Sequence, residues 1–355
     1  MTQARGGPLA AAAGVAAVLV LIGALVLGWA LWAYGGPGPA ATAPAAAPAD
    51  PGRDLPATPE TTVILRRGAG LGEIALALER AGVIRSALVF GLAARLTGAA
   101  ADLKAGEYAF PSRFPMAEVL GKIRRGEIVR HRVTIPEGVT SAQAAAILER
   151  HPVLTGAAPE PPEGAILPET YDVQRGDDRG AVLNRMRAAR DKALAELWAQ
   201  RQSGLPVRTP EEAVILASIV EKETAVAAER PRVAAVFVNR LRRGMRLESD
   251  PTIIYGLTRG LPLVDAAGRR RGLRQSELAR PNPYSTYQIS GLPPTPIANP
   301  GIDSLRAVLD PPATQDLFFV ADGSGGHVFA GSFDEHLRNV ARWRQVERGR
   351  AAGGR

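Results

Sequence analysis

The feature that most constrains this chain is an uncharged, apolar run near its N-terminus, from Ala11 to Tyr34. An α-helix needs about 20 apolar residues to cross the roughly 30 Å hydrocarbon core of a bilayer, and this run is long enough. Trp29 and Trp32 lie near its far end, where amphipathic aromatic rings favour the membrane interface. The run therefore predicts a transmembrane anchor over residues 11–34.

The charges that flank this run predict its orientation. Arg5 lies within residues 1–10, whereas residues 35–52 contain neither Lys nor Arg. Because basic flanks stay in the cytoplasm, we expect residues 1–10 to be cytoplasmic and the folded part to lie outside the inner membrane, in the periplasm. A cleaved signal peptide is the alternative, since small residues follow in AAAPAD, but the apolar region of a signal is usually only about 7–15 residues long. Both interpretations put the folded part on the same side.

Two segments are expected to lack a core of their own. Residues 35–60 carry a proline every few positions, which predicts an extended, semi-rigid linker. At roughly 3 Å per residue, such a linker would hold the first domain tens of Å from the bilayer. Residues 346–355, at the other end, are expected to form a disordered tail.

The composition is that of a globular protein with a large core, because 46% of the 355 residues are hydrophobic and 22% are charged. The absence of cysteine excludes disulfides, zinc–thiolate sites and cysteine nucleophiles. The net charge of +8 would suit an anionic partner, but all except four of the 43 basic residues are Arg, which indicates a coding bias. We therefore predict no nucleic-acid partner.

Two stretches share a strand–turn–helix pattern. Residues 63–65 predict a short strand, and a glycine-rich turn leads from it into an apolar-periodic helix over 73–82. The pattern returns in residues 133–150. The spacing Gly68-x-Gly70-x-Gly72 is neither a dinucleotide fingerprint nor a P-loop. The first stretch resembles the opening of LysM modules, which implies a small α+β unit over 61–130 that binds N-acetylglucosamine-containing polymers; a packing unit without a ligand is the alternative.

A third pattern places charges in a buried helix. Thr209 fits the N-cap position, and Pro210 fits the first turn that follows. Residues 213–220 are apolar on every side, so this helix is expected to be buried. The sequence Glu221-Lys222-Glu223 comes next, and we expect it near the middle of the helix, where an unpaired carboxylate costs several kcal/mol.

Glu221 and Glu223 lie on different sides of this helix. Glu221 shares its face with Val214 and with three small residues, Ala217, Ser218 and Ala225, which would leave a groove where water is scarce. Such surroundings raise the pKa of a glutamic acid, and a carboxyl group still protonated near neutral pH can donate a proton to a leaving oxygen. Glu223 also has apolar neighbours, so periodicity does not choose between the two. A structural ion pair with Lys222 or an arginine is the alternative role for either glutamate.

Four longer motifs carry a resemblance to a known family: LASIVEKETAVAAER, VFVNRLRRGMRLESDPTIIYGL, NPYSTYQISGLPPTPIANPG and ADGSGGHVFAGSFDEH. Over roughly Thr61–Arg344, the chain resembles the MltG/YceG family of endolytic murein transglycosylases. The resemblance implies that Glu221, the first glutamate of IVEKE, is the catalytic residue and that residues 131–345 form the catalytic domain. It also implies cleavage inside nascent peptidoglycan strands, between N-acetylmuramic acid and N-acetylglucosamine, which leaves 1,6-anhydro ends and consumes no water.

This chemistry needs one carboxyl group that acts first as an acid and then as a base, whereas ordinary glycosidases use two. No cofactor or metal is implied, and the four histidines lack metal-ligand spacing. The resemblance suggests enzymes of peptidoglycan synthesis as protein partners.

Further side chains suit sugar recognition, although each could instead cap or pack: Asn239, Asp250, Tyr255, Tyr284, Tyr287 and Glu169. The pair Asp250-Pro251 predicts a turn before a strand over 252–255. Three residues that could suggest a hydrolase triad, Asp322, Ser324 and His327, fall between two strand-like segments, which predicts a β-hairpin loop instead.

The expected fold is therefore α+β, with a transmembrane helix, a LysM-like unit and a larger mixed catalytic domain. The expected activity is lytic cleavage of glycan strands, with the substrate-contacting residues other than Glu221 unassigned. A non-catalytic wall-binding scaffold and a hydrolytic muramidase are the alternatives, because residue types do not determine whether water or the sugar's own hydroxyl group reaches C1.

Overall fold

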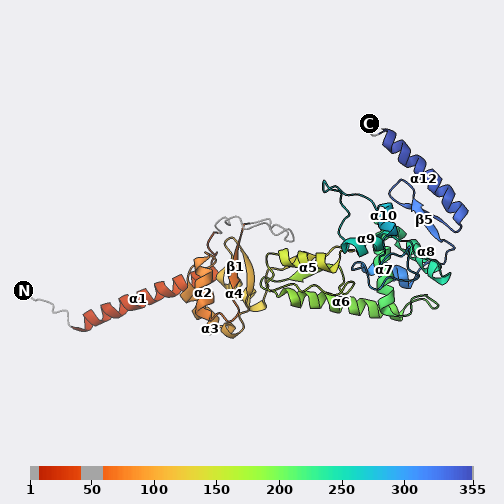
Figure 1. Ribbon diagram of the computed structural model, residues 1–355. Coiled ribbons are helices and arrows are strands. Elements are labelled where there is room, and N and C mark those ends of the chain that lie inside the picture. Colours follow the sequence, from red (N-terminus) through yellow and green to blue (C-terminus); the bar gives the residue numbers. More distant parts are fainter. Residues whose placement is uncertain (1–7, 41–58, 354–355) are drawn as a thin grey trace, which may run out of the picture. The chain divides into compact units, whose positions relative to one another are not determined.

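The computed structural model describes residues 8–40 and 59–353, and the chain divides into two compact units (Figure 1). Unit 1 comprises the residues up to Arg132 together with Asp172–Gly176, and unit 2 comprises Val133–Tyr171 and Asp177–Arg355. The described residues form helices and three two-stranded sheets. The fold is therefore mixed α+β, as the sequence predicted.

Unit 1 places helices against one antiparallel strand pair. Its elements are α1 (Pro8–Gly35), β1 (Glu60–Leu65), α2 (Leu71–Arg80), α3 (Ala87–Leu96), the 3₁₀ turn η1 (Ala99–Ala101), β2 (Gly106–Pro111) and α4 (Met116–Arg125). β1 and β2 pair in a register that runs from Glu60 opposite Pro111 to Leu65 opposite Gly106.

The core of unit 1 forms because apolar residues alternate along β1 and recur on the helices. Val63 and Leu65 are buried, whereas Ile64 between them is 54% exposed. The two inward side chains share a cluster with residues of α2, α3, β2 and α4, among them Leu78, Phe90, Tyr108, Phe110 and Ile123. Ile64 therefore lies on the face of the strand pair that points away from these helices.

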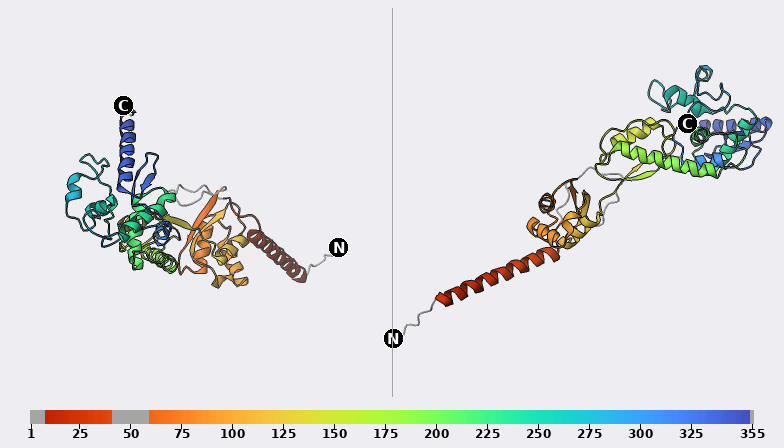
Figure 2. Two further views of the ribbon diagram at one scale, coloured as in Figure 1. Left: turned by 90° about the vertical axis from the view of Figure 1, so that its right-hand side faces the viewer. Right: turned by 90° about the horizontal axis from the view of Figure 1, so that it is seen from below.

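α1 contains one segment, Val15–Gly35, that is long and apolar enough to cross a membrane. Figure 2 shows it as part of one continuous helix. The side chains of residues 15–29 are exposed, as those of a helix surrounded by lipid would be. This segment fits the predicted single-pass anchor.

The structure differs from the spacer predicted over residues 35–60. The end of α1 packs directly on unit 1, because Ala33 is buried in its core. The residues that follow are fastened to Arg113: the N–H of Gly38 donates to the Arg113 carbonyl at 2.9 Å, and the N–H of Arg113 donates to the Pro39 carbonyl at 2.9 Å. Small side chains at the end of α1 allow this close approach. The rest of the predicted linker, residues 41–58, lies outside the described residues.

The predicted strand–turn–helix repeat is confirmed. β1 leads through Gly68 into α2, and β3 (His131–Thr134) leads through Gly138 into α5 (Ser141–Arg150). Both glycines are left-handed, with φ of +80° and +74°, a conformation that glycine adopts without steric cost. β3 pairs with β4 (Thr170–Val173), so the second copy does not extend the first sheet.

Unit 2 is built around three helices, α7 (Pro210–Glu223), α8 (Arg230–Arg242) and α11 (Ile302–Leu309), of which α11 packs against both others. Their buried side chains form one cluster, and it includes Ile219, Phe237 and Leu305. Its other elements are α6 (Arg179–Ala199), the 3₁₀ turn η2 (Ala227–Glu229), α9 (Asp250–Thr258), α10 (Gln275–Ala279), β5 (Phe318–Ala321), β6 (His327–Ala330) and α12 (Phe333–Gly353).

The hairpin predicted near the C-terminus is confirmed. β5 and β6 pair antiparallel, with a register from Phe318 opposite Ala330 to Ala321 opposite His327. α12 packs beside this hairpin, as the views in Figure 2 also show. The predicted disordered tail over 346–355 is wrong as far as Gly353, because α12 continues to that residue. The segment contains no proline, and its Glu, Arg and Ala residues favour a helix, although its glycines do not.

The strand predicted over residues 252–255 is also wrong. These residues belong to α9, which Ser249 precedes as the N-cap residue and which has Pro251 in its first turn. Thr252, Ile253 and Tyr255 are buried in this helix. Burial against unit 2 thus outweighs the preference of β-branched residues for strands.

Candidate active site

α7 carries Glu221 in its last turn. Thr209 caps the helix, because its hydroxyl oxygen accepts the N–H of Glu212 at 3.1 Å, and Pro210 lies in the first turn, as predicted. The sequence suggested that Glu221 lies near the middle of this helix. That expectation is wrong, because the helix ends at Glu223. Because the free carbonyl groups at a helix C-terminus disfavour a carboxylate, other elements must stabilise Glu221.

Three donors from other elements surround Glu221, whose side chain is only 4% exposed. The N–H of Gly301 and the hydroxyl of Ser304 donate to Oε2 at 2.9 and 2.8 Å, and the guanidinium of Arg230 donates to Oε1 at 3.0 Å. Gly301 is the N-cap residue of α11, and Ser304 lies in its first turn. Glu221 thus joins the end of α7 to the start of α11, where free N–H groups favour a carboxylate.

Arg230 holds a second carboxylate beside Glu221. Its Nη2 atom also donates to Glu137 Oε2 at 2.7 Å. The Nε atom of the same guanidinium is buried and has no hydrogen-bond partner among the described residues. The site therefore combines two carboxylates, one cation and one unused donor.

Two glycines allow the backbone to approach this group closely. A Cβ atom at Gly301 would collide with the carboxylate of Glu137, and one at Gly138 would lie 3.3 Å from Cγ of Glu221. Lys222 fixes the same turn, because its Nζ donates to the Gly138 carbonyl at 3.1 Å. The ion pair considered for Glu221 therefore forms with Arg230, and Lys222 supports the backbone beside it.

The groove predicted on the Glu221 face of α7 is filled by the chain itself. Ala217 and Ser218 are fully buried. The hydroxyl of Ser218 donates to the Ile215 carbonyl at 2.7 Å and accepts the N–H of Ile297 at 3.0 Å. Ala225 lies beyond the end of the helix and is exposed. The small residues of α7 thus hold the segment that leads to Gly301.

A half-buried carboxyl group, Glu163, helps to fix the same segment, because the side-chain amide of Asn299 donates to it at 3.4 Å. It accepts the N–H of Ser141 at 2.8 Å and the hydroxyl of Tyr255 at 3.1 Å. Burial raises the pKa of Glu163 above its usual range, although these hydrogen bonds oppose the shift. The side-chain amide of Asn299 donates to the Val139 carbonyl at 3.1 Å. Gly301 thus lies two residues after Asn299, whose side chain is held in place by this hydrogen bond.

Glu223, the competing glutamate, has different surroundings. It accepts a hydrogen bond from the hydroxyl of Ser249. Burial raises the pKa of Glu223 to about 7, the Ser249 bond opposes this shift, and the nearby charge of Asp250 adds to it. Glu223 therefore lies in surroundings that favour its protonated form.

The tyrosines considered for sugar binding fall into two places. Tyr255, which reaches Glu163, packs edge-on against Tyr284, with 4.9 Å between the ring centroids. Tyr287 lies elsewhere and donates its hydroxyl to Asp250 at 2.9 Å. Tyr255 and Tyr284 are therefore the two that adjoin the network around Gly301.

Two further candidates, Asn239 and Glu169, have surroundings that indicate structural roles. The amide of Asn239 donates to the carbonyls of Thr314 and Asp316, each at 3.0 Å. Glu169 has an exposed side chain, and its carbonyl accepts the N–H of Ile135 at 3.0 Å. None of these contacts reaches Glu221.

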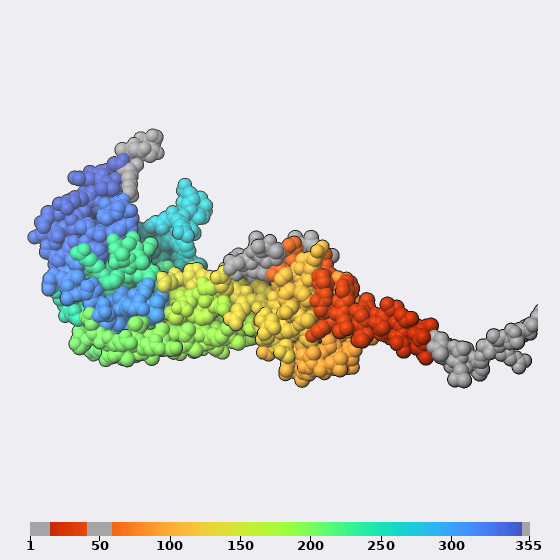
Figure 3. Space-filling view, turned by 180° about the vertical axis from the view of Figure 1, so that it is seen from behind, coloured from red at the N-terminus to blue at the C-terminus, as the bar shows by residue number. Residues whose placement is uncertain are grey.

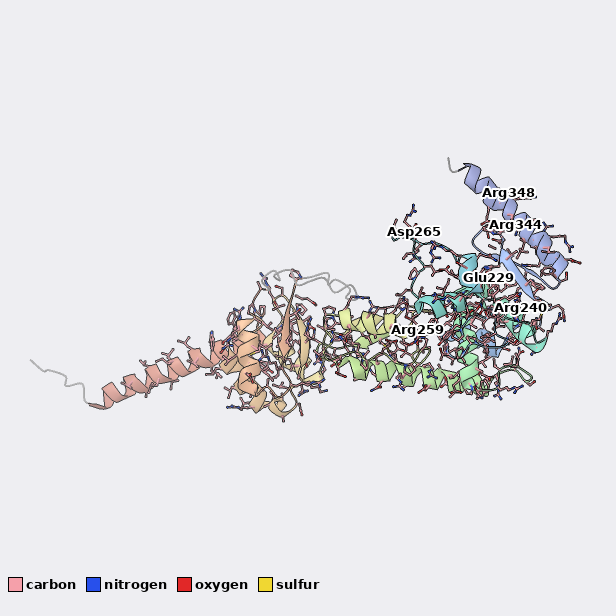
Figure 4. All side chains as sticks on the ribbon, viewed as in Figure 1. Glu229, Arg240, Arg259, Asp265, Arg344 and Arg348 are labelled. Atoms are coloured by element: carbon pink, nitrogen blue, oxygen red, sulfur yellow. The ribbon has the colours of Figure 1, made fainter. Side chains whose placement is uncertain are left out.

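Asp322, Ser324 and His327 do not form a triad. The hydroxyl of Ser324 donates to Asp322 at 2.8 Å, within the hairpin loop. Nδ1 of His327 instead lies 2.7 Å from Oε2 of Glu229, which is labelled in Figure 4. Burial acts to raise the pKa of Glu229, but the hydrogen bonds that Glu229 accepts from His327 and Thr224 outweigh it, so the pKa is lowered.

The sequence analysis did not identify four residues that surround Glu221. Arg230 and Gly301 are the last residues of two of the motifs quoted above, so those motifs contained a signal. Glu137 and Ser304 lie outside the four motifs, and no local pattern distinguishes them.

One buried glutamate, Glu221, thus lies between two helix ends, beside a cation and a second carboxylate. The chain belongs to the YceG-like family, whose model matches residues 63–342.

Its relatives carry a common name. A protein of Streptococcus pneumoniae serotype 2 (strain D39 / NCTC 7466), named endolytic murein transglycosylase, is 29% identical over 327 residues, which cover 79% of this chain. This chain spans only 58% of that relative's length. The protein of the same name from Bacillus subtilis (strain 168) is 26% identical over 302 residues, which cover 76% of this chain and 81% of the relative.

A crystal structure of the yceG-like protein lmo1499 from Listeria monocytogenes is 26% identical to this chain. The match has a TM-score of 0.48 and covers 79% of this chain and 98% of that one.

Proposed function

We propose that this protein is a lytic transglycosylase that cleaves peptidoglycan strands internally, between N-acetylmuramic acid and N-acetylglucosamine. Its family membership and the names of its relatives support this activity. The structural observation that carries the proposal is the carboxyl group of Glu221, buried among Gly301, Ser304 and Arg230.

In the proposed reaction, Glu221 first acts as an acid. Its proton passes to the glycosidic oxygen while the bond from that oxygen to C1 breaks. The oxygen of the C6 hydroxyl of the same muramic acid then bonds to C1, and its proton returns to the Glu221 carboxylate. The product ends in a 1,6-anhydro sugar, no water is consumed, and Glu221 is restored.

Arg230 gives the site a means of accommodating both forms of Glu221. A protonated Glu221 no longer needs a cation, and Arg230 then keeps Glu137 as its partner, to which its Nη2 is already 2.7 Å away. When Glu221 becomes a carboxylate again, the same Nη2 stabilises it. The Nε–H of Arg230, which is buried without a hydrogen-bond partner among the described residues, remains a donor that a small rearrangement of the site could use.

The rest of the chain suits delivery of this activity to the cell wall. We infer that residues 61–130 form a LysM-like unit that holds the glycan, since their order β1–α2–α3–β2 puts two helices between two antiparallel strands. We also infer that α1 anchors the chain in the inner membrane with its N-terminus in the cytoplasm, given the position of Arg5. Enzymes of peptidoglycan synthesis are the protein partners that such a location would offer.

The deciding experiment is digestion of purified sacculi and nascent strands by the full-length chain in detergent, with products analysed by mass spectrometry. Wild type is compared with Glu221→Gln and with Glu211→Gln, an exposed glutamate on the same helix. We expect anhydro products, lighter by one water than hydrolytic fragments, from wild type and Glu211→Gln only. Reducing ends of full mass would instead identify a muramidase. Bound glycan without any products would identify a scaffold.

A further inference from the structure

Helix α3 exposes a stripe of leucines that has no partner among the described residues. Leu88, Leu92 and Leu96 are 77%, 52% and 78% exposed. Their spacing of four residues puts them on one side of the helix. On the opposite side, Val89, Phe90 and Ala94 are buried in the core of unit 1. A folded unit therefore presents an apolar face that its own core does not use.

The charges beside this stripe are positive. Arg85 lies two residues before the helix, Arg95 lies between the last two leucines in the sequence, and both are exposed. α3 itself contains no acidic residue, and the carboxylate of Glu79 accepts the N–H of Ala87, in the first turn of α3, at 2.9 Å. Leucines flanked by arginines are typical of helices that lie in a membrane interface, where long cationic side chains reach the headgroups.

α3 also packs beside the end of the membrane-spanning segment. Ala30 and Ala33 of α1 contact the core of unit 1, to which α3 contributes Phe90. The guanidinium of Arg85 lies 4.2 Å from the ring centroid of Trp32 and donates to the Pro37 carbonyl at 2.8 Å. The space-filling view shows the red atoms of α1 in direct contact with the orange atoms of unit 1 (Figure 3). The strands and shorter helices of unit 1 thus begin where the apolar helix ends.

The length of α1 sets the depth of this contact. The segment Val15–Gly35 has 21 residues. At about 1.5 Å per residue it is about 32 Å long, close to the roughly 30 Å hydrocarbon core. Ala30 and Ala33 lie in its last two turns, so the elements that touch them are level with the lipid headgroups and not tens of Å away.

We propose that the exposed face of α3, formed by Arg85, Leu88, Leu92, Arg95 and Leu96, rests in the outer surface of the same bilayer that α1 spans. Its partner is lipid: the leucines enter the boundary between headgroups and acyl chains, and the two arginines meet anionic headgroups. This inference goes beyond the proposed activity and rests on the proposed anchor. The contact would keep the α3 face of unit 1 toward the membrane.

The absence of cysteine makes a direct test possible, because one introduced cysteine labels a single position. The variants are Leu92→Cys on the stripe, Val20→Cys in α1, and Ile64→Cys as a matched control. Ile64 is an equally exposed aliphatic residue of unit 1 that faces away from the helix layer. Each full-length variant is labelled with an environment-sensitive fluorophore and reconstituted in phosphatidylethanolamine–phosphatidylglycerol vesicles, with and without lipids that carry a nitroxide quencher in the headgroup or acyl chain.

We expect the label at Leu92→Cys to emit at shorter wavelength than the label at Ile64→Cys, and to lose emission to the headgroup quencher. The label at Val20→Cys should lose emission chiefly to the acyl-chain quencher. If Val20→Cys is quenched and Leu92→Cys behaves like Ile64→Cys, the contact with lipid is refuted and the anchor stands. If neither responds, both fail together. A third outcome would also overturn the proposal. If the label at Leu92→Cys emits at short wavelength, is not quenched by either lipid quencher, and shifts further as the protein density in the vesicles rises, the partner of this face is a second copy of the chain. Digestion of sacculi by the same variants in detergent tests the catalytic proposal separately.

Discussion

Glu137 and Glu221 share one nitrogen atom of Arg230, which lies 2.7 Å from the first carboxylate and 3.0 Å from the second. Arg230 therefore balances two negative groups at once. A group that must alternate between acid and base is sensitive to a cation at this distance, because the cation favours the deprotonated form.

Replacement of Arg230 by Gln should lower activity. The variant loses the guanidinium that donates to both Glu137 and Glu221, and because preorganised charge beside a reacting group is a large part of catalysis, we expect the rate to fall about tenfold or more. The measurement is the rate of anhydro-product formation from sacculi. Arg232→Gln is the matched control, since Arg232 lies on the same helix but pairs with Asp316 at 2.6 Å. An unchanged rate for Arg230→Gln would contradict the role given to this residue.

Replacement of Gly301 by Ala should damage the site more than the fold. The added Cβ atom would collide with the carboxylate of Glu137 and displace the N–H that Glu221 accepts. Because small misplacements at a reacting group are costly, we expect kcat/KM to fall about 10- to 100-fold. Gly272→Ala is the control, because no heavy atom lies within 4 Å of its added Cβ. Equal activity of the two variants would show that this close approach is unimportant.

Replacement of Ser218 by Ala should lower stability. The substitution leaves the buried N–H of Ile297 without the hydroxyl oxygen that accepts it at 3.0 Å, and we expect a loss of about 1–3 kcal/mol in the free energy of unfolding. Urea titration followed by circular dichroism measures this loss. Ser203→Ala, at an exposed position, should change the same quantity by no more than about 0.5 kcal/mol. A comparable effect at both positions would contradict the assigned role of Ser218.

Glu223 should make stability fall as pH rises. Its pKa is about 7 in the folded protein against an ordinary value of 4.5, so folding favours the protonated form. The stability associated with that form is fully present below pH 4.5 and is lost as pH rises through 7. Glu223→Gln cannot titrate, so its stability relative to wild type should improve between pH 5 and pH 8, by on the order of 1–3 kcal/mol. A difference between the two proteins that stays constant with pH would refute this assignment.

Local features of the fold could be predicted from the sequence. The cap at Thr209, the burial of the helix behind it and the hairpin around Asp322 follow from neighbouring residues, and each was predicted correctly. The repeated strand–turn–helix pattern was also predicted correctly, and the structure adds that Gly68 and Gly138 in its turns are left-handed. Residues 252–255 were assigned wrongly because their β-branched side chains suggested a strand, whereas packing against unit 2 keeps them helical.

The surroundings of Glu221 could not be predicted in the same way. Its donors come from positions 9, 80 and 83 residues away along the chain, and no local pattern states which of them will meet. Small residues on α7 predicted open space beside Glu221, but the segment before Gly301 fills that space. The sequence indicated Glu221 as the candidate, and only the tertiary structure supplied its neighbours.

The way in which Glu221 joins the end of α7 to the start of α11 has a consequence for the timing of activity. Glu137, from the first part of unit 2, and Ser304, from near its end, must both be in place before the carboxyl group has its neighbours. A chain still emerging from a ribosome, or still being threaded across a membrane, has no assembled site. The surroundings of Glu221 are therefore complete only when both ends of unit 2 have folded together.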